Sequence, residues 1–131
     1  MVGLDTNVIV RYITQDDPDQ SKMATTFIEK NCTVENPGYI NEIVLCEIVW
    51  VLKRAYQYDK KVIIDVLHKL QMTSELLVEN ADNVRKATEA YISGNADFSD
   101  YLIAISNHQK GCTYTVSFDK NFSSTDFVRA I

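Results

Sequence analysis

Five acidic residues of this chain stand where the sequence predicts strand ends, helix starts or an otherwise apolar helix. They are Asp5, Glu47, Asp97, Asp100 and Asp119. Carboxylate oxygens are the ligands that hard cations such as Mg²⁺ and Mn²⁺ prefer. A bound metal, or two about 4 Å apart, lowers the pKa of a water and stabilises charge on a phosphoryl oxygen. Acids clustered without His or Cys therefore suit phosphodiester hydrolysis, with no covalent nucleophile on the protein.

Asp5 stands between a predicted strand and a predicted helix. Residues 1–4 suit the end of a buried strand, and an apolar face of helical spacing follows over residues 8–13. In an open parallel sheet, ligands bind beyond the carboxyl ends of the strands, where Asp5 would lie. The alternative is that Asp5 only caps the helix, since Asp is a favoured N-cap residue.

Glu47 is the one acid inside the apolar run from Ile43 to Leu52, in a helix predicted over residues 41–56. We expect this helix to be buried on most sides. An unpaired buried carboxylate is costly, so Glu47 needs a cation, a metal or a raised pKa. The alternative is an ion pair with a residue such as Arg11. Glu42 is predicted to be structural, because an acid near a helix start interacts favourably with the helix dipole.

Asp97 and Asp100 open a helix predicted from about residue 96, and their spacing puts both side chains on one face. Asp97 has the right place for an N-cap. A second acid at Asp100 adds repulsion unless a cation joins the two. Asp119 follows a strand predicted over residues 113–118, much as Asp5 follows its strand. An Asx turn is the structural alternative for Asp119.

The remaining elements alternate along the chain. Helices are predicted at 18–31, at 60–72 and from residue 80 or 82 to 93, and short strands at 39–40 and 76–78. This alternation predicts an α/β sandwich with a mostly parallel sheet. The length of 131 residues fits one domain spanning residues 1–131.

Composition and charge restrict the classes of function. The chain is 46% hydrophobic and 24% charged, as in soluble globular proteins. No stretch approaches the ~18 apolar residues of a membrane span, and no leader pattern opens the chain, so we expect a cytoplasmic protein without membrane contact. The net charge of −5 argues against a simple basic nucleic-acid clamp. If the protein handles nucleic acid, divalent cations must offset its negative charge locally.

The cysteines and histidines are widely separated. Cys32, Cys46 and Cys112 are predicted to be buried free thiols in a reducing compartment. His68 and His108 lie far apart, so a zinc site built on Cys and His is not expected.

Four basic residues gather where the helix of Glu47 ends and the next one begins: Lys53, Arg54, Lys60 and Lys61. The favoured interpretation is a solvated helix end whose cations complement the helix dipole. A phosphate-contacting role is the alternative.

Four segments carry a resemblance to a known family: Leu-Asp-Thr-Asn at 4–7, Leu-Cys-Glu-Ile-Val-Trp at 45–50, Ala-Asp-Phe-Ser-Asp-Tyr-Leu-Ile-Ala at 96–104, and Val-Ser-Phe-Asp-Lys-Asn-Phe at 116–122. In order and spacing they resemble the PIN-domain family, and more closely its VapC-type toxins of prokaryotic toxin–antitoxin pairs. The resemblance covers nearly the whole chain. A single Asp-Thr-Asn after a strand is a weak signal, whereas four motifs in register are a strong one.

The resemblance implies a Mg²⁺- or Mn²⁺-dependent endoribonuclease with a three-layer α/β/α sandwich around a mostly parallel central sheet. By motif match, the catalytic acids are Asp5, Glu47, Asp100 and Asp119. The metal ligands are predicted among Asp5, Asp97, Asp100 and Asp119, where Asp97 binds metal or supports its helix.

The same match to the family's motifs gives supporting roles to Thr6, Asn7 and Asn121. Thr6 and Asn7 position a metal-bound water or order the turn at Asp5, and the second role is favoured. Asn121 stands where the family often has another acid, which leaves the number of metal ions open. The resemblance also implies a homodimer, an RNA substrate, and a cognate antitoxin whose tail covers the active site. Which RNA is cut stays open.

Other classes fit less well. A haloacid-dehalogenase-type domain needs a second Asp two residues after its nucleophile, where Asn7 stands. A receiver-type domain needs an acidic pair near its first strand, but Asp16 and Asp17 lie too far along the chain from the strand predicted at residues 1–4. A catalytically inactive PIN-like module that binds RNA or a partner is the third alternative. The four intact acids argue against it.

Overall fold

The computed structural model describes residues 1–123 and 125–131. Its contacts divide the chain into two compact units, Met1–Ala81 and Asp82–Ile131.

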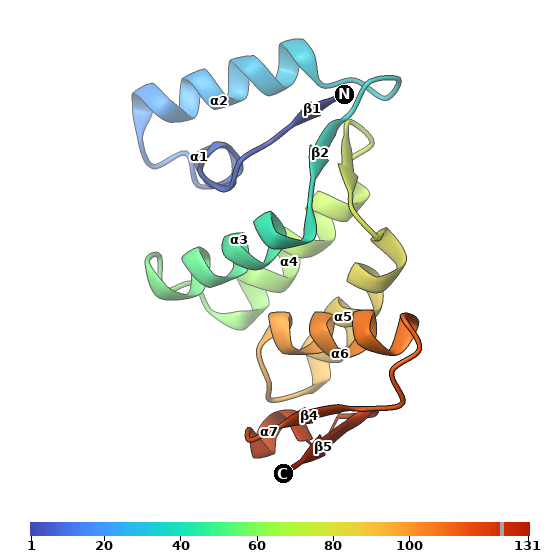
Figure 1. Cartoon of the computed structure of the whole chain (residues 1–131). Helices are drawn as coiled ribbons and strands as arrows, with labels where there is room; N and C mark the ends of the chain where they lie inside the picture. Colours follow the sequence, from blue (N-terminus) through green and yellow to red (C-terminus); the bar gives the residue numbers. More distant parts are fainter. Residues whose placement is uncertain (124) are drawn as a thin grey trace. The chain divides into compact units, whose positions relative to one another are not determined.

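The first unit is built on a parallel sheet of three short strands in the order β1-β2-β3 (Figure 1). These are β1 (Val2–Gly3), β2 (Gly38–Ile40) and β3 (Leu76–Val78). Val2 pairs with Gly38, and Gly38 pairs in turn with Leu76. Parallel neighbours need long crossover connections, and helices supply them here.

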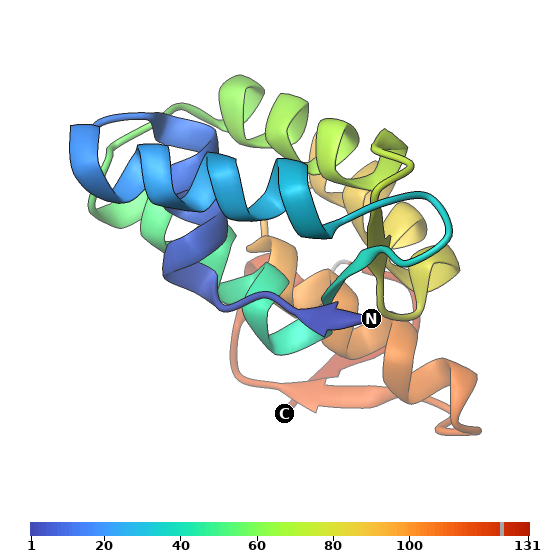
Figure 2. The same ribbon diagram turned by 90° about the horizontal axis from the view of Figure 1, so that it is seen from above.

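Four helices make these connections. Helices α1 (Thr6–Thr14) and α2 (Pro18–Asn31) join β1 to β2, and α3 (Glu42–Arg54) and α4 (Lys60–Met72) join β2 to β3. Helix α1 packs against both α2 and α3, and α3 packs against α4. Figure 2 shows α1 and α2 side by side in blue.

Local sequence explains where these helices begin. The side chains of Asp17, Asn41 and Asp59 accept hydrogen bonds from the backbone N–H groups three residues on, at 2.9, 2.8 and 3.1 Å. Each therefore satisfies an amide that the first helical turn leaves without a partner. Pro18 follows Asp17 at the first helical position, where its missing N–H costs nothing.

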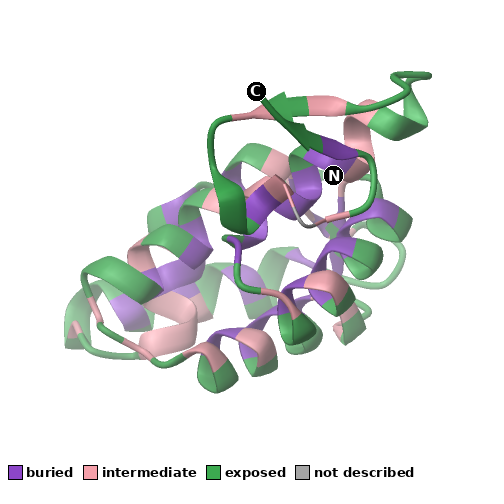
Figure 3. Cartoon of the chain, turned by 90° about the horizontal axis from the view of Figure 1, so that it is seen from below, coloured by how far each residue is buried: buried purple, intermediate pink, exposed green. Residues whose placement is uncertain are grey.

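The core of the first unit comes from the inner faces of these helices and from β2. Its fully buried side chains include Ile9, Ile40, Leu45, Ile48, Leu52, Ile63 and Leu67. Figure 3 shows the resulting division of the helices into buried and exposed faces.

The second unit combines helices with a separate parallel pair of strands. It contains α6 (Phe98–Gln109), β4 (Thr115–Ser117), α7 (Lys120–Ser123), β5 (Val128–Ala130), and all but the first residue of α5 (Ala81–Ser93). Strands β4 and β5 pair in parallel, with Val116 opposite Arg129. The rings of Tyr91 and Phe98 meet edge to face at 6.1 Å in its core.

The predicted α/β class is confirmed, because every pairing of described strands is parallel and helices connect them. The bounds predicted for 18–31, 60–72 and 76–78 agree with α2, α4 and β3. The strand predicted over residues 113–118 contains β4, and α7 and β5 follow it, two elements that the sequence did not predict. None of the helices in the described part of the chain is long and apolar enough to cross a membrane.

Two predictions of burial are also wrong. Helix α3 is not buried on most sides, since Glu47 lies at its surface, and Ile43 and Trp50 are 72% and 60% exposed. All three cysteines are free thiols, but only Cys32 is buried, while Cys46 is half-buried and Cys112 exposed. Burial raises the pKa of the Cys46 thiol to about 11, so it stays protonated at neutral pH.

We expect Gly94→Ala to destabilise the protein by about 1–3 kcal/mol, the usual cost of overpacking. A Cβ at this position would lie 2.6 Å from Cζ of the buried Tyr101 and even closer to its hydroxyl oxygen. That oxygen accepts a hydrogen bond from the Ala96 N–H at 3.1 Å, just before α6. Urea unfolding measures the effect, with Gly3→Ala as the control, because nothing lies within 4 Å of a Cβ there. Equal unfolding midpoints for the two variants would contradict this prediction.

Candidate active site

Asp5 lies at the carboxyl end of β1 and is the N-cap residue of α1. The sheet pattern continues to its neighbour, because the Leu4 N–H donates to the Tyr39 carbonyl at 2.9 Å. Unlike Asp17, Asn41 and Asp59, Asp5 makes no side-chain cap hydrogen bond within the described structure. The alternative that its carboxylate only caps the helix is therefore not supported. Asp5 is an exposed acid at a strand end.

Thr6 joins the start of α1 to the middle of α3. Its hydroxyl group is buried with the residue and donates a hydrogen bond of 3.2 Å to Oε1 of Glu47. The bond places Glu47 beside the Asp5–Thr6 turn and fixes one oxygen of its carboxylate. Glu47 is thus held by a neutral hydroxyl at an exposed position, and the predicted need for a buried countercharge does not arise.

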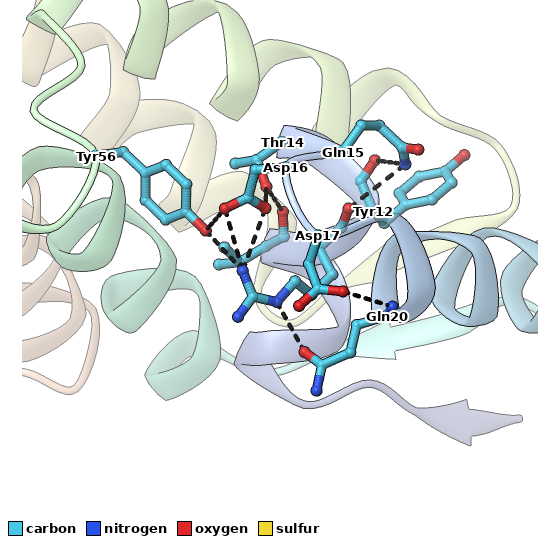
Figure 4. A network of polar contacts seen from close by, with 9 residues as sticks. Tyr12, Thr14, Gln15, Asp16, Asp17, Gln20 and Tyr56 are labelled. Carbon is cyan, nitrogen blue, oxygen red and sulfur yellow. Dashed lines mark hydrogen bonds and ion pairs between the residues drawn. The ribbon is translucent and has the colours of Figure 1, made fainter.

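Arg11, the predicted alternative partner of Glu47, instead takes part in a network at the other end of α1 (Figure 4). Its Nη1 lies 3.2 Å from both oxygens of Asp16 and 3.0 Å from the hydroxyl oxygen of Tyr56. Tyr56 and Thr14 donate to the same carboxylate at 2.8 and 2.6 Å. The Arg11 Nε donates to Gln20 on α2 at 2.9 Å.

This network ties α1, the α1–α2 turn, α2 and the chain just after α3 together. Hydrogen bonds from Thr14 and Tyr56, with a further one from Arg11, lower the pKa of the Asp16 carboxyl group from 3.8 to about 2. The sequence did not reveal this cluster, because Tyr56 lies 45 residues from Arg11. Only packing brings them together.

Asp97 and Asp100 meet at the start of α6 in the second unit. They form a capping box, in which the Asp97 N–H donates to Oδ2 of Asp100 at 3.1 Å. The structural role expected of Asp97 as an N-cap is therefore present. Asp100 also has a structural role, since one of its oxygens accepts a hydrogen bond from a backbone amide.

Asp119 follows β4 and forms the Asx turn that was its structural alternative. The N–H of Asn121 donates to Oδ1 of Asp119 at 2.9 Å, and α7 begins there. The Asp119 N–H donates to Oγ of Ser117 at 3.0 Å. The chain reverses between α6 and β4, so the start of α6 and the end of β4 lie at the same end of this unit (Figure 1).

The chemistry of the predicted donor set fits a hard divalent cation, because every predicted ligand is a carboxylate. Among the described residues, however, no group of three or more His, Cys, Asp or Glu side chains is placed to hold a metal ion. The structure brings Asp97 to Asp100 in one unit and Thr6 to Glu47 in the other. Assembly of all the acids into one metal centre remains a prediction.

The described strands all pair in parallel, acids follow β1 and β4, and two more acids lie at the start of α6. The family model of the PIN domain matches residues 2–128, and the chain belongs to the PIN-domain family. A protein named VapC ribonuclease, from Aquifex aeolicus (strain VF5), is 23% identical over 124 residues, which cover 95% of this chain and 91% of that protein. Both matches confirm the resemblance to the PIN-domain family that the sequence motifs indicated.

Asp16→Asn tests the network at Arg11. Because the pKa of Asp16 is about 2 in the folded protein and 3.8 without its partners, its stabilising effect is full above about pH 4 and lost as the pH falls through 2. We therefore expect the variant to have a lower thermal midpoint than wild type at pH 5–7, with the two converging toward pH 2. Asp19→Asn, which removes an exposed acid in the first turn of α2, is the control. A midpoint difference independent of pH would refute this role of Asp16.

Proposed function

We propose that this protein is a divalent-metal-dependent endoribonuclease that hydrolyses RNA phosphodiester bonds, and that it is the toxin of a type II toxin–antitoxin pair. Membership of the PIN-domain family and the similarity to the Aquifex protein named VapC ribonuclease support this function. The observation that carries it is the turn at Asp5. There a strand-end carboxylate takes no part in capping the helix, and Thr6 holds the carboxylate of Glu47 next to it.

In this proposal Asp5, Asp97, Asp100 and Asp119 bind Mg²⁺ or Mn²⁺, and Glu47 completes the catalytic set and adds negative charge that favours cation binding. The metal would lower the pKa of the attacking water and stabilise charge on the phosphate. These metal-binding acids belong to two units of the chain: Asp5 lies in the first unit, and Asp97, Asp100 and Asp119 lie in the second.

The protein residues around these acids set their positions. Thr6 orients Glu47 through one oxygen and leaves the other for the reaction. Asn7 supports the turn at Asp5. Asn121 holds Oδ1 of Asp119 through its backbone N–H, a contact that does not require an acidic side chain at position 121.

The alternative function is a catalytically inactive PIN-like module that binds RNA or a partner. The capping box and the Asx turn favour this alternative. They give Asp97, Asp100 and Asp119 structural roles, which an inactive module would also need. Metal-dependent cleavage discriminates between the two functions.

The proposed partners are an RNA substrate, a second copy of the chain in a cytoplasmic homodimer, and a cognate antitoxin. A pocket of about 550 Å³ between β1, α1 and α2 suits a segment of the antitoxin. Val8, Met23 and Phe27 line it, so it would take apolar side chains. Asp5 lies on the same pocket, where a cationic side chain of the antitoxin would cover the acid.

The first test of metal binding is thermal unfolding across a Mn²⁺ titration, with wild type beside Glu47→Gln. A ligand that binds only the native state stabilises it by RT ln(1 + [L]/Kd), about 2.7 kcal/mol at a hundredfold excess over Kd. We expect the wild-type midpoint to rise with Mn²⁺ and the rise in Glu47→Gln to be much smaller. Asp65→Asn, an exposed acid on α4, should respond like wild type. An equal rise in all three proteins would place the bound metal elsewhere.

The test of catalysis is cleavage of single-stranded RNA with Mg²⁺, with Mn²⁺ and with EDTA. We expect wild type to cut with either metal and not with EDTA, and Asp5→Asn to lose at least about 100-fold in rate, the size of loss seen when one electrostatic group is removed from an active site. Asp5→Asn should keep its cooperative unfolding transition, because its carboxylate makes no cap bond. Metal binding without cleavage by wild type would favour the inactive module.

A further inference from the structure

One stripe of helix α3 joins the predicted catalytic acid Glu47 to exposed residues that the proposed active site does not use. Positions 43, 47, 50 and 54 follow one another at helical spacing and share one face of α3. All four residues are exposed: Ile43, Glu47, Trp50 and Arg54. The stripe thus combines a predicted catalytic acid, a large aromatic ring and a cation.

Trp50 is the single tryptophan of the chain and is 60% exposed. Trp side chains are highly buried on average, so an exposed indole ring that shares a helix face with the exposed Ile43 is unusual. The Arg54 guanidinium group lies over this ring, 5.9 Å from its centroid. No carboxylate within 4 Å neutralises Arg54 in the described part of the chain, so its charge remains available.

We propose that Trp50 and Arg54 bind single-stranded RNA next to the scissile phosphate, with a base stacked on the indole ring and a phosphate paired with the guanidinium group. This inference rests on the proposed nuclease function and adds residues to it. Proteins that bind single strands combine aromatic rings with cations in this way, and Arg is suited to phosphate by its planar fork of donors.

The spacing along α3 suits this role. A helix rises about 1.5 Å per residue, so Trp50 lies about 4.5 Å and Arg54 about 10.5 Å along the axis from Glu47. A phosphate held beside Glu47 therefore has its neighbouring nucleotide within reach of the ring and the next phosphate within reach of Arg54. The positive charge also meets a need of this chain, whose net charge of −5 repels RNA.

A second copy of the chain is the competing occupant. Two α3 helices packed antiparallel about Trp50 would set Glu47 of each copy near Arg54 of the other, as a twofold interface allows. Such an interface would cover Glu47, the acid that the proposed function needs at the substrate. RNA is compatible with an accessible Glu47 and is therefore favoured.

The experiment uses the full chain in EDTA, which prevents metal-dependent cleavage, and a fluorescein-labelled mixed-sequence 12-nucleotide RNA. Because Trp50 is the single tryptophan, its fluorescence reports directly on this position, and titration with unlabelled RNA should quench it. By anisotropy, Trp50→Ala should weaken binding about 5- to 150-fold, as loss of one stacked base does, and Trp50→Phe should retain most of the affinity. Arg54→Gln should reduce the slope of log K against log salt by about 0.7, the value for one phosphate contact in a single strand.

Matched controls are Met72→Ala, another exposed apolar residue, and Lys69→Gln, another exposed cation, both on α4. Met72→Ala should leave RNA affinity unchanged. Lys69→Gln should leave the salt slope unchanged. Circular dichroism confirms that each variant is folded.

Two outcomes overturn the inference. RNA binding that leaves Trp50 fluorescence and the Trp50→Ala affinity unchanged places the RNA elsewhere. Sedimentation that shows a dimer in wild type and a monomer in Trp50→Ala assigns the stripe to a second copy.

Failure of the proposed function looks different: RNA quenches Trp50 fluorescence, yet wild type cuts no RNA with either metal. If wild type cuts RNA but Trp50→Ala binds RNA as tightly as wild type does, the inference about Trp50 fails and the proposed function stands.

Discussion

The packing of α1 against α3 is the constraint on which the candidate site of the first unit depends. Two polar contacts hold these elements at opposite ends of α1. At its start, the Thr6 hydroxyl group binds the Glu47 carboxylate, and near its end Arg11 and Asp16 bind Tyr56 just beyond α3. Contacts at both ends oppose sliding and rotation of one helix on the other. The position of Glu47 relative to the strand end at Asp5 is thereby fixed by contacts that are themselves remote from the predicted chemistry.

The elements that could be predicted from the sequence are those with local signals at their ends. Asp17 with Pro18 starts α2, and Asp59 starts α4, through side-chain bonds to amides three residues on. Strand β5 has no such signal, because it contains three residues and two of them are exposed. Its pairing with β4 comes from contacts between positions 13 residues apart, which a local pattern does not encode.

The candidate site could be predicted as a set of residues but not as a set of contacts. The spacing of the motifs singles out Asp5, Glu47, Asp100 and Asp119, and the family match supports that choice. Asp5 and Asp17 have the same residue type and the same position before a helix, yet only Asp17 caps its helix with its side chain. Propensity treats these two residues alike, and their difference lies in side-chain geometry.

The error over α3 has a physical cause that bears on function. Ile43 and Trp50 make the sequence of this helix look buried on most sides, because hydropathy does not distinguish a core face from a binding face. The core face is the one with Leu45, Ile48 and Leu52, which are fully buried. Leaving Ile43 and Trp50 in water has a cost of order 1.5–3 kcal/mol per large side chain relative to burial. A cost of that size on the face that carries Glu47 is understandable if the same face binds a ligand, since binding would remove the indole ring from water.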